Sequence, residues 1–342
     1  MTDYTATSTN RNADFQTAIY GTYQGRSMTP DVLLGQEFHD ATAVSNFVAL
    51  LNTAPNSPGD WTAAPFINGP DTDSTFFYRT SRVAYQTTTI VSAGSSTAGQ
   101  PPRNTYRYDL QIVGAAANSS LLSCYSVHLK ASDTDVDQAT RLIETTRIRD
   151  NAQTLPAGRN FLVAGDFNIQ SSSQSAYQEL VGSQANNAGR FFDPINTPGN
   201  WNNNSAFRFV HTQDPAGAGG MDDRLDLILL DTSLGDGANL DYKGNPQIAY
   251  SATTWDDPNH SYRAWGNDGT SFNTTLNTTT NSMVGPDIAS ALKRSALSGG
   301  HLPVFLDLSY AVVPEPGTVV FALAGSLPLV AAAVRRRRCK RA

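Results

Sequence analysis

An apolar run that ends in two polar side chains constrains the fold of this chain more than any other stretch. Residues 161–168 read Phe-Leu-Val-Ala-Gly-Asp-Phe-Asn. Consecutive apolar residues predict a buried strand, and Gly165 lets the chain leave that strand with few steric limits. We therefore expect Asp166 and Asn168 at the end of a buried strand, where both side chains can face one site.

These two side chains have two interpretations. A carboxylate can orient or deprotonate a water molecule, and a carboxamide N–H can donate to a phosphoryl oxygen that gains charge during a reaction. Asp and Asn are also common turn residues, so the same letters are typical of a strand that ends in an Asx turn. The pair alone does not distinguish a catalytic site from a turn.

Two further strand-like runs end in ionisable side chains. Residues 31–38 carry Glu37 near their end, and residues 121–130 carry His128. Ligands of open α/β sheets bind at the carboxyl ends of strands, so both are candidate site residues. Glu37 could equally serve the N-terminus of the helix expected after it, which favours negative charge. For His128 taken alone, a half-buried side chain bonded to the backbone is the more common interpretation.

The second half of the chain offers another pair of ionisable groups. Asp226 stands at the entrance of an apolar run, and His301 begins the strand expected over residues 298–308. A partly buried carboxylate needs a partner, so we expect Asp226 to orient His301. An oriented histidine can act as a base or as a cation that faces a phosphate. An Asp-rich loop before a strand is the alternative for Asp222 and Asp223, and it explains the partly buried Asp226 less well.

The spacing of apolar residues over 135–153 predicts a helix, with acids early and arginines late as the helix dipole prefers. This helix lies between two strand-like runs, which indicates an α/β fold. Residues 255–285 form a long polar segment, and such segments are usually either functional or disordered.

Composition limits the partners. Only 16% of the 342 residues are charged, and the net charge is -6. Six cations lie in the last eight residues, so the remainder carries about −12 and has no general footprint for a nucleic-acid backbone. Phosphate contacts would therefore be local or mediated by a metal. The two cysteines, Cys124 and Cys339, offer neither a disulfide framework nor a zinc site.

Short motifs around these residues follow one another in a familiar order. They are Gln36-Glu37, Val127-His128-Leu129-Lys130-Ala131, Gly165-Asp166-Phe167-Asn168, Arg224-Leu225-Asp226 and Gly300-His301-Leu302-Pro303-Val304. Over residues 31–310 the chain resembles the endonuclease/exonuclease/phosphatase superfamily, which includes DNase I-like nucleases, sphingomyelinases and inositol-polyphosphate phosphatases. An ordered set of motifs is far more specific than any one of them.

The resemblance implies a DNase I-like fold, a four-layer α/β sandwich with two packed, mainly antiparallel sheets flanked by helices. It implies a divalent metal, Mg²⁺ or Mn²⁺, bound by Glu37, and a phosphate contact from His128. Asp166 would orient or deprotonate the attacking water, and Asn168 would hold phosphoryl oxygens. Asp226 would orient His301.

Two departures from the family pattern bear on activity. Gly300 stands where the family has an Asp that supports metal binding. The family also opens with a strand that carries an Asn at the metal site, and this chain has no clear counterpart unless Asp3 replaces it. We expect a truncated start to the domain, which we place at residues 1–312.

The last residues, 313–342, resemble a PEP-CTERM sorting signal: Val313-Pro314-Glu315-Pro316, an apolar segment over 318–334 and an arginine cluster. The resemblance implies export, with the tail processed by sorting machinery or anchored in a membrane. The N-terminus shows no secretory signal, which also fits a shortened start.

The leading hypothesis is an exported, metal-dependent and monomeric phosphoesterase that hydrolyses a phosphodiester such as nucleic acid. A phospholipid, sphingomyelin-type or small phosphodiester is the alternative substrate. A surface-binding protein of the same fold with impaired catalysis is the competing hypothesis.

Overall fold

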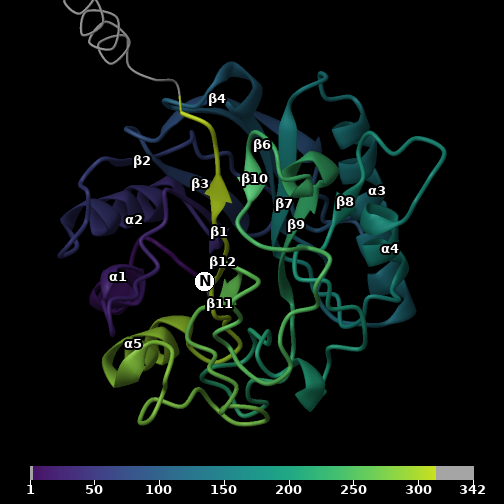
Figure 1. Ribbon diagram of the computed structural model, residues 1–342. Coiled ribbons are helices and arrows are strands. Elements are labelled where there is room, and N and C mark those ends of the chain that lie inside the picture. Colours follow the sequence, from purple (N-terminus) through teal and green to yellow (C-terminus); the bar gives the residue numbers. More distant parts are fainter. Residues whose placement is uncertain (1–2, 313–342) are drawn as a thin grey trace, which may run out of the picture.

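The computed structural model describes residues 3–312, apart from the side chain of Asn118, and contains two β-sheets that pack face to face (Figure 1). The first sheet has the strand order β1-β3-β2 and is antiparallel. Its strands are β1 (Val32–Phe38), β2 (Trp61–Ala63) and β3 (Asp73–Arg79). β1 therefore lies at one edge of this sheet.

The second sheet has the order β4-β5-β6-β7-β9-β8. All of its neighbours are antiparallel except β6 and β7, which are parallel and therefore need a crossover helix between them. Its strands are β4 (Val83–Ser92), β5 (Thr105–Ile112), β6 (Leu121–His128), β7 (Asn160–Asp166), β8 (Phe191–Phe192) and β9 (Asp226–Asp231).

An apolar core lies between the two sheets. Leu34 and Phe76 from the first sheet belong to the same cluster as Leu162 and Ile228 from the second. β7 is buried along its whole length, as its apolar sequence predicts, because helices cover the other face of the sheet.

Helices form the outer layers. α3 (Asp135–Gln153) is the crossover between β6 and β7 and packs with α4 (Ser175–Val181) on the second sheet. α1 (Asn12–Tyr20) and α2 (Ala41–Thr53) cover the outer face of the first sheet, and α5 (Gly285–Ala296) packs against α1. Figure 1 shows the order helix, sheet, sheet, helix from left to right. The predicted four-layer α/β sandwich is confirmed.

The prediction of one continuous strand over residues 298–308 is wrong. The structure breaks it into β12 (Val304–Phe305), paired with β11 (Arg263–Ala264), and β13 (Leu308–Ser309), paired with β10 (Asp241–Tyr242). Pro303 has no N–H to donate, and the segment has strand neighbours on one side only. Short 3₁₀ helices occupy the connections Ser8–Arg11, Ala117–Ser119, Ser205–Phe207 and Thr232–Gly235.

The long polar segment is packed against the domain. Trp265 is 2% exposed, and its indole N–H donates to the carbonyl of Ala18. The amide of Asn281 donates to the carbonyl of Gly266. Hydrogen bonds to α1 and within the segment thus hold residues 255–285, which contain little regular structure.

Within residues 3–312, no helix is long and apolar enough to cross a membrane. The predicted sorting tail and the apolar segment 318–334 lie outside the described residues.

Candidate active site

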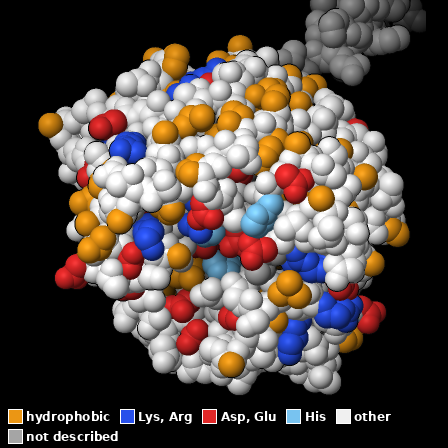
Figure 2. Space-filling model, turned by 180° about the vertical axis from the view of Figure 1, so that it is seen from behind, with side chains coloured by type: hydrophobic (Ala, Val, Ile, Leu, Met, Phe, Trp, Pro, Cys, Tyr) orange, Lys and Arg blue, Asp and Glu red, His pale blue; other side chains and the backbone are white. Residues whose placement is uncertain are grey.

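Three strands of the second sheet bring their polar ends together. In the parallel pair, His128 lies beside Asp166, and in the antiparallel pair Asp166 lies beside Asp226. Glu37 approaches from β1 in the facing sheet. The cleft at this edge is lined by Gln36, Glu37, His128, Asp166, Asp226, Gly299, Gly300 and His301. Figure 2 shows acidic and histidine side chains gathered around a hollow on this face.

Gly165 has a steric reason to be glycine. Its φ is 139°, and a Cβ there would lie 2.0 Å from the carbonyl oxygen of Val127. The chain can therefore pass close to β6 and deliver Asp166 to the cleft only without a side chain at this position.

Asp166 is buried at the base of the cleft. Its Oδ1 accepts a hydrogen bond of 2.9 Å from the backbone N–H of Asn168. Burial raises the pKa of Asp166 to about 6, although the positive charge on His301 acts in the opposite direction. A carboxylate that is ionised at neutral pH but readily protonated is suited to accept a proton from water.

Asn168 adopts a left-handed backbone with φ of 51°, which Asn tolerates better than most residues. Its amide donates to the carbonyl of Leu129 at 3.1 Å. One N–H of this amide thus holds the turn after β7, and the second N–H is the one that could reach a phosphoryl oxygen. Both interpretations of the sequence, turn and donor, are compatible with this geometry.

His301 and Asp226 form the expected pair. The Nδ1 atom of His301 lies 2.8 Å from Oδ2 of Asp226 and 3.9 Å from Oδ2 of Asp166. Burial alone would lower the pKa of His301, but the two carboxylates outweigh it and raise the pKa to about 9. The imidazole is therefore a cation at neutral pH and lines the cleft.

His128 is held in the opposite charge state. Its side chain is 8% exposed, and burial lowers its pKa well below the usual value, so the ring is neutral. Its Nε2 lies 3.5 Å from Oδ2 of Asp166, and its buried Nδ1 has no hydrogen-bond partner among the described residues. That Nδ1 atom lies 3.9 Å from Oε1 of Glu37.

An irregularity in β1 changes the backbone conformation at Glu37 and with it the direction of the side chain. The register with β3 shifts between Gly35 and Phe38, and Glu37 has a φ of 64°. Its Oε2 accepts from the backbone N–H of Asp3 at 2.9 Å, while the carboxylate of Asp3 pairs with His39. Asp3 thus positions Glu37 through its backbone.

The donor set fits a hard divalent cation that keeps most of its water. Glu37 is a partly exposed carboxylate at the mouth of the cleft, and Mg²⁺ is commonly held by one or two carboxylates plus water and phosphate. No three His, Cys, Asp or Glu side chains within residues 3–312 are grouped as a closed metal site. A tightly caged metal such as structural zinc does not fit.

Sequence reasoning missed Gln213. Its amide lies 3.0 Å from Nε2 of His301, and it also bonds to the carbonyl of Gly299. The atom that faces the ring is the amide nitrogen, which donates and so matches a neutral imidazole; beside the charged ring the amide has to turn so that its oxygen accepts from Nε2. It lies in an irregular loop without a motif, so no local signal could have indicated it.

No protein-family model and no curated protein matches the sequence. Similar solved structures include a D. rerio TDP2 humanized by 14 mutations, with 18% identity over 68% of this chain and 81% of that chain and a TM-score of 0.44. A functionally unknown conserved protein from Enterococcus faecalis V583 has 13% identity over 88% and 91%, with a TM-score of 0.46. An endonuclease/exonuclease/phosphatase family protein from Bacteroides thetaiotaomicron has 13% identity over 66% and 73%, with a TM-score of 0.42. With similarity at this level, the chemistry of the cleft has to be inferred from its own side chains.

Proposed function

We propose that this cleft hydrolyses a phosphodiester by in-line attack of water. The observation that carries the proposal is a buried carboxylate and a buried imidazole in one cleft, whose pKa values lie on either side of neutral pH. The pKa of Asp166 is raised to about 6 and that of His301 to about 9, and their side chains approach to 3.9 Å. At neutral pH this arrangement offers a proton acceptor beside a cation.

Each side chain has a role in this proposal. Asp166 orients the attacking water and takes its proton. His301, held by Asp226, places positive charge where negative charge develops on the phosphoryl oxygens. Neutral His128 and the second N–H of Asn168 add hydrogen bonds to the same oxygens. Glu37 would hold Mg²⁺ or Mn²⁺, which supplies charge neutralisation at the phosphate when bound.

We also infer that the chain belongs to the endonuclease/exonuclease/phosphatase superfamily. The support is the order of its motifs together with the four-layer architecture that places them at one edge. We also propose, from the sequence alone, export and membrane attachment through residues 318–334. The test is to fractionate cells that express either the full chain or a chain without residues 313–342, and to compare where the two proteins are found.

The test compares plasmid DNA, a sphingomyelin analogue and bis-p-nitrophenyl phosphate as substrates, each with Mg²⁺, with Mn²⁺ and with a chelator. We expect chelator-sensitive turnover of at least one, and the preferred substrate identifies the class. Asp166→Asn and His301→Gln should each lower the rate by roughly a hundredfold to ten-thousandfold. Asp256→Asn, a change at an exposed residue away from the cleft, is the matched control.

Absence of chelator-sensitive turnover on all three substrates would contradict the proposal and favour a binding protein of the same fold. Gly300, which lines the cleft, favours that alternative because the resemblance implies an Asp there. A large gain in the Mg²⁺-dependent rate of Gly300→Asp would show that the natural site is impaired.

A further inference from the structure

A buried carboxylate on the crossover helix lies close to the turn that follows β6 and has no part in the proposed reaction. Glu144, on α3, is 1% exposed. Its Oε2 atom accepts a hydrogen bond of 3.0 Å from the backbone N–H of Lys130, two residues after His128. Glu144 thus reaches from the outer helical layer to the end of a strand that carries a site residue.

This position is costly for a carboxylate. Burial raises the pKa of Glu144 to about 7. Two influences act in the opposite direction: the hydrogen bond from Lys130 and the positive charges on Arg103, Arg141 and Arg147. A glutamine would also offer an acceptor, but a hydrogen bond to an ionised group is roughly twice as strong as a neutral one. The carboxylate therefore holds the Lys130 N–H more firmly than an amide would.

A single peptide group connects this carboxylate to Asn168. The N–H of the peptide between Leu129 and Lys130 donates to Glu144, and the C=O of the same peptide accepts from the side-chain amide of Asn168 at 3.1 Å. A trans peptide group is planar, and its N–H and C=O point in opposite directions. The hydrogen bond to Glu144 therefore fixes the direction of the carbonyl to which Asn168 donates.

Two other hydrogen bonds hold the backbone of this turn. The N–H of Leu129 donates to the carbonyl of Asp166 at 2.9 Å, and the N–H of Asn168 donates to Oδ1 of Asp166. Neither bond fixes the side-chain amide of Asn168. The bond to the Leu129 carbonyl does so, and it depends on the peptide that Glu144 orients.

We propose that Glu144 is a positioning residue, which directs the side-chain amide of Asn168 through the Leu129–Lys130 peptide. The proposal rests on the proposed hydrolysis, in which the second N–H of Asn168 donates to a phosphoryl oxygen. Negative charge on that oxygen grows in the transition state, so a misplaced donor should lower kcat more than it raises KM. Glu144 is not among the residues that line the cleft and contacts no reacting atom.

The test compares Glu144→Met and Glu144→Gln at about pH 8, above the pKa of Glu144. Met has a similar length but no acceptor, whereas Gln keeps one. We expect Glu144→Met to lower kcat by about tenfold and to change KM by less than about threefold. Glu144→Gln should lower kcat by less than about threefold. Glu179→Met, the same change on α4, is the matched control and should leave both constants unchanged.

A double-mutant cycle separates the positioning of Asn168 from a general loss of stability. Asn168→Ala removes the donor that Glu144 holds, so Glu144→Met should lower kcat by less than about twofold in that background. An equal fall in both backgrounds overturns the proposal, and so does a natural kcat in Glu144→Met. If Glu144→Met does not fold, the smaller apolar residue in Glu144→Leu takes its place.

Hydrogen exchange measured by NMR tests the same link without a substrate. In Glu144→Met, exchange of the Lys130 backbone N–H and of the Asn168 side-chain amide should both accelerate by about tenfold or more. Acceleration at Lys130 alone overturns the proposal, because Glu144 would then hold only the backbone. If the natural chain hydrolyses none of the three substrates, the proposed hydrolysis fails, and this measurement still decides whether Glu144 holds Asn168.

Discussion

Asp226 is the main group that keeps the proton on His301, because the two buried side chains lie 2.8 Å apart. The same carboxylate also opposes ionisation of Asp166, which is its partner across the β7–β9 pair. One residue thus affects both the proposed proton acceptor, Asp166, and the proposed cation, His301. Removing it should disturb the charge of the site more than its shape.

This coupling predicts a bell-shaped dependence of kcat/KM on pH for bis-p-nitrophenyl phosphate. The rate should be maximal between about pH 6 and about pH 9. Below the lower limit Asp166 is protonated and cannot accept a proton from water. Above the upper limit His301 loses its positive charge. A pH–rate profile at constant ionic strength measures both limits.

Asp226→Asn gives the control for this assignment. The loss of one carboxylate lowers the pKa of His301 and, to a smaller degree, that of Asp166, so both limits should move to lower pH. An upper limit that stays in place would show that His301 is not the group responsible for it.

At the scale of elements, the start of β9 is fixed by a buried ion pair. Arg224 is fully buried, and its guanidinium donates to both carboxylate oxygens of Asp193 at 2.8 and 3.0 Å. It also donates to Thr197 and lies 5.0 Å from the centre of the Trp201 ring. Since Asp226 follows two residues later, this pair anchors the catalytic end of the strand.

Asp193→Asn should therefore lower stability and turnover together. A buried guanidinium without its carboxylate costs about 3–5 kcal/mol, which corresponds to a fall in Tm of roughly 10 °C. Lys243→Gln breaks an exposed ion pair and should change stability by less than about 1 kcal/mol. Thermal unfolding and turnover of the two variants are compared; equal effects would mean that the buried pair does not anchor the strand.

The elements that the sequence predicts well are those whose pattern is local. The crossover helix has a capping box, in which Thr134 and Asp137 bond to each other's backbone, and β7 has its continuous apolar run. The prediction of one strand over residues 298–308 was wrong because strand pairing there depends on β10 and β11, which are distant in sequence. Gln213 was missed for the same reason: its proximity to His301 arises only when two loops meet.

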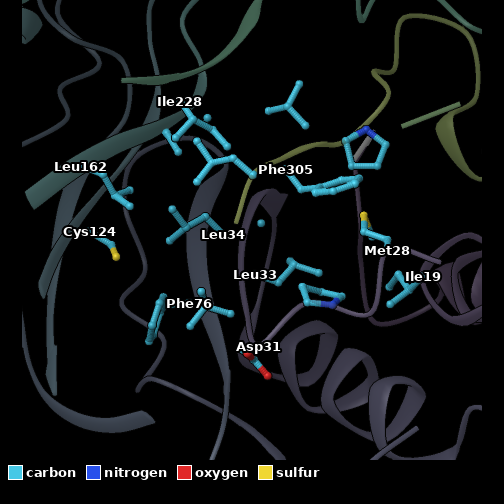
Figure 3. Close-up of a pocket in the computed structure, with 18 of the residues that line it drawn as sticks. Ile19, Met28, Asp31, Leu33, Leu34, Phe76, Cys124, Leu162, Ile228 and Phe305 are labelled. Carbon is cyan, nitrogen blue, oxygen red and sulfur yellow. The ribbon is translucent and has the colours of Figure 1, made fainter. Parts of the chain in front are cut away.

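At the scale of the whole molecule, the cavity lined by β1, β7, β9 and the segment 302–308 is a large energetic term (Figure 3). At roughly 24 cal/mol per Å³, a closed apolar cavity of about 410 Å³ would cost on the order of 10 kcal/mol, close to the entire stability of a typical domain. This figure is an upper bound because the cavity opens into the cleft. Motifs alone could not indicate this cavity, because its walls come from elements that only the complete fold brings together.

Side chains that grow into this cavity should therefore stabilise the protein. Ala164 lines the cavity from β7, and Ala164→Val adds two methyl groups for a gain of about 1–2 kcal/mol, or a few degrees in Tm. Its neighbour Val163 points to the opposite, closely packed face, where Val163→Ile should cost about 1–3 kcal/mol. Thermal unfolding of both variants separates the two faces. A loss of stability in Ala164→Val as large as that in Val163→Ile would show that the cavity does not accept the added methyl groups.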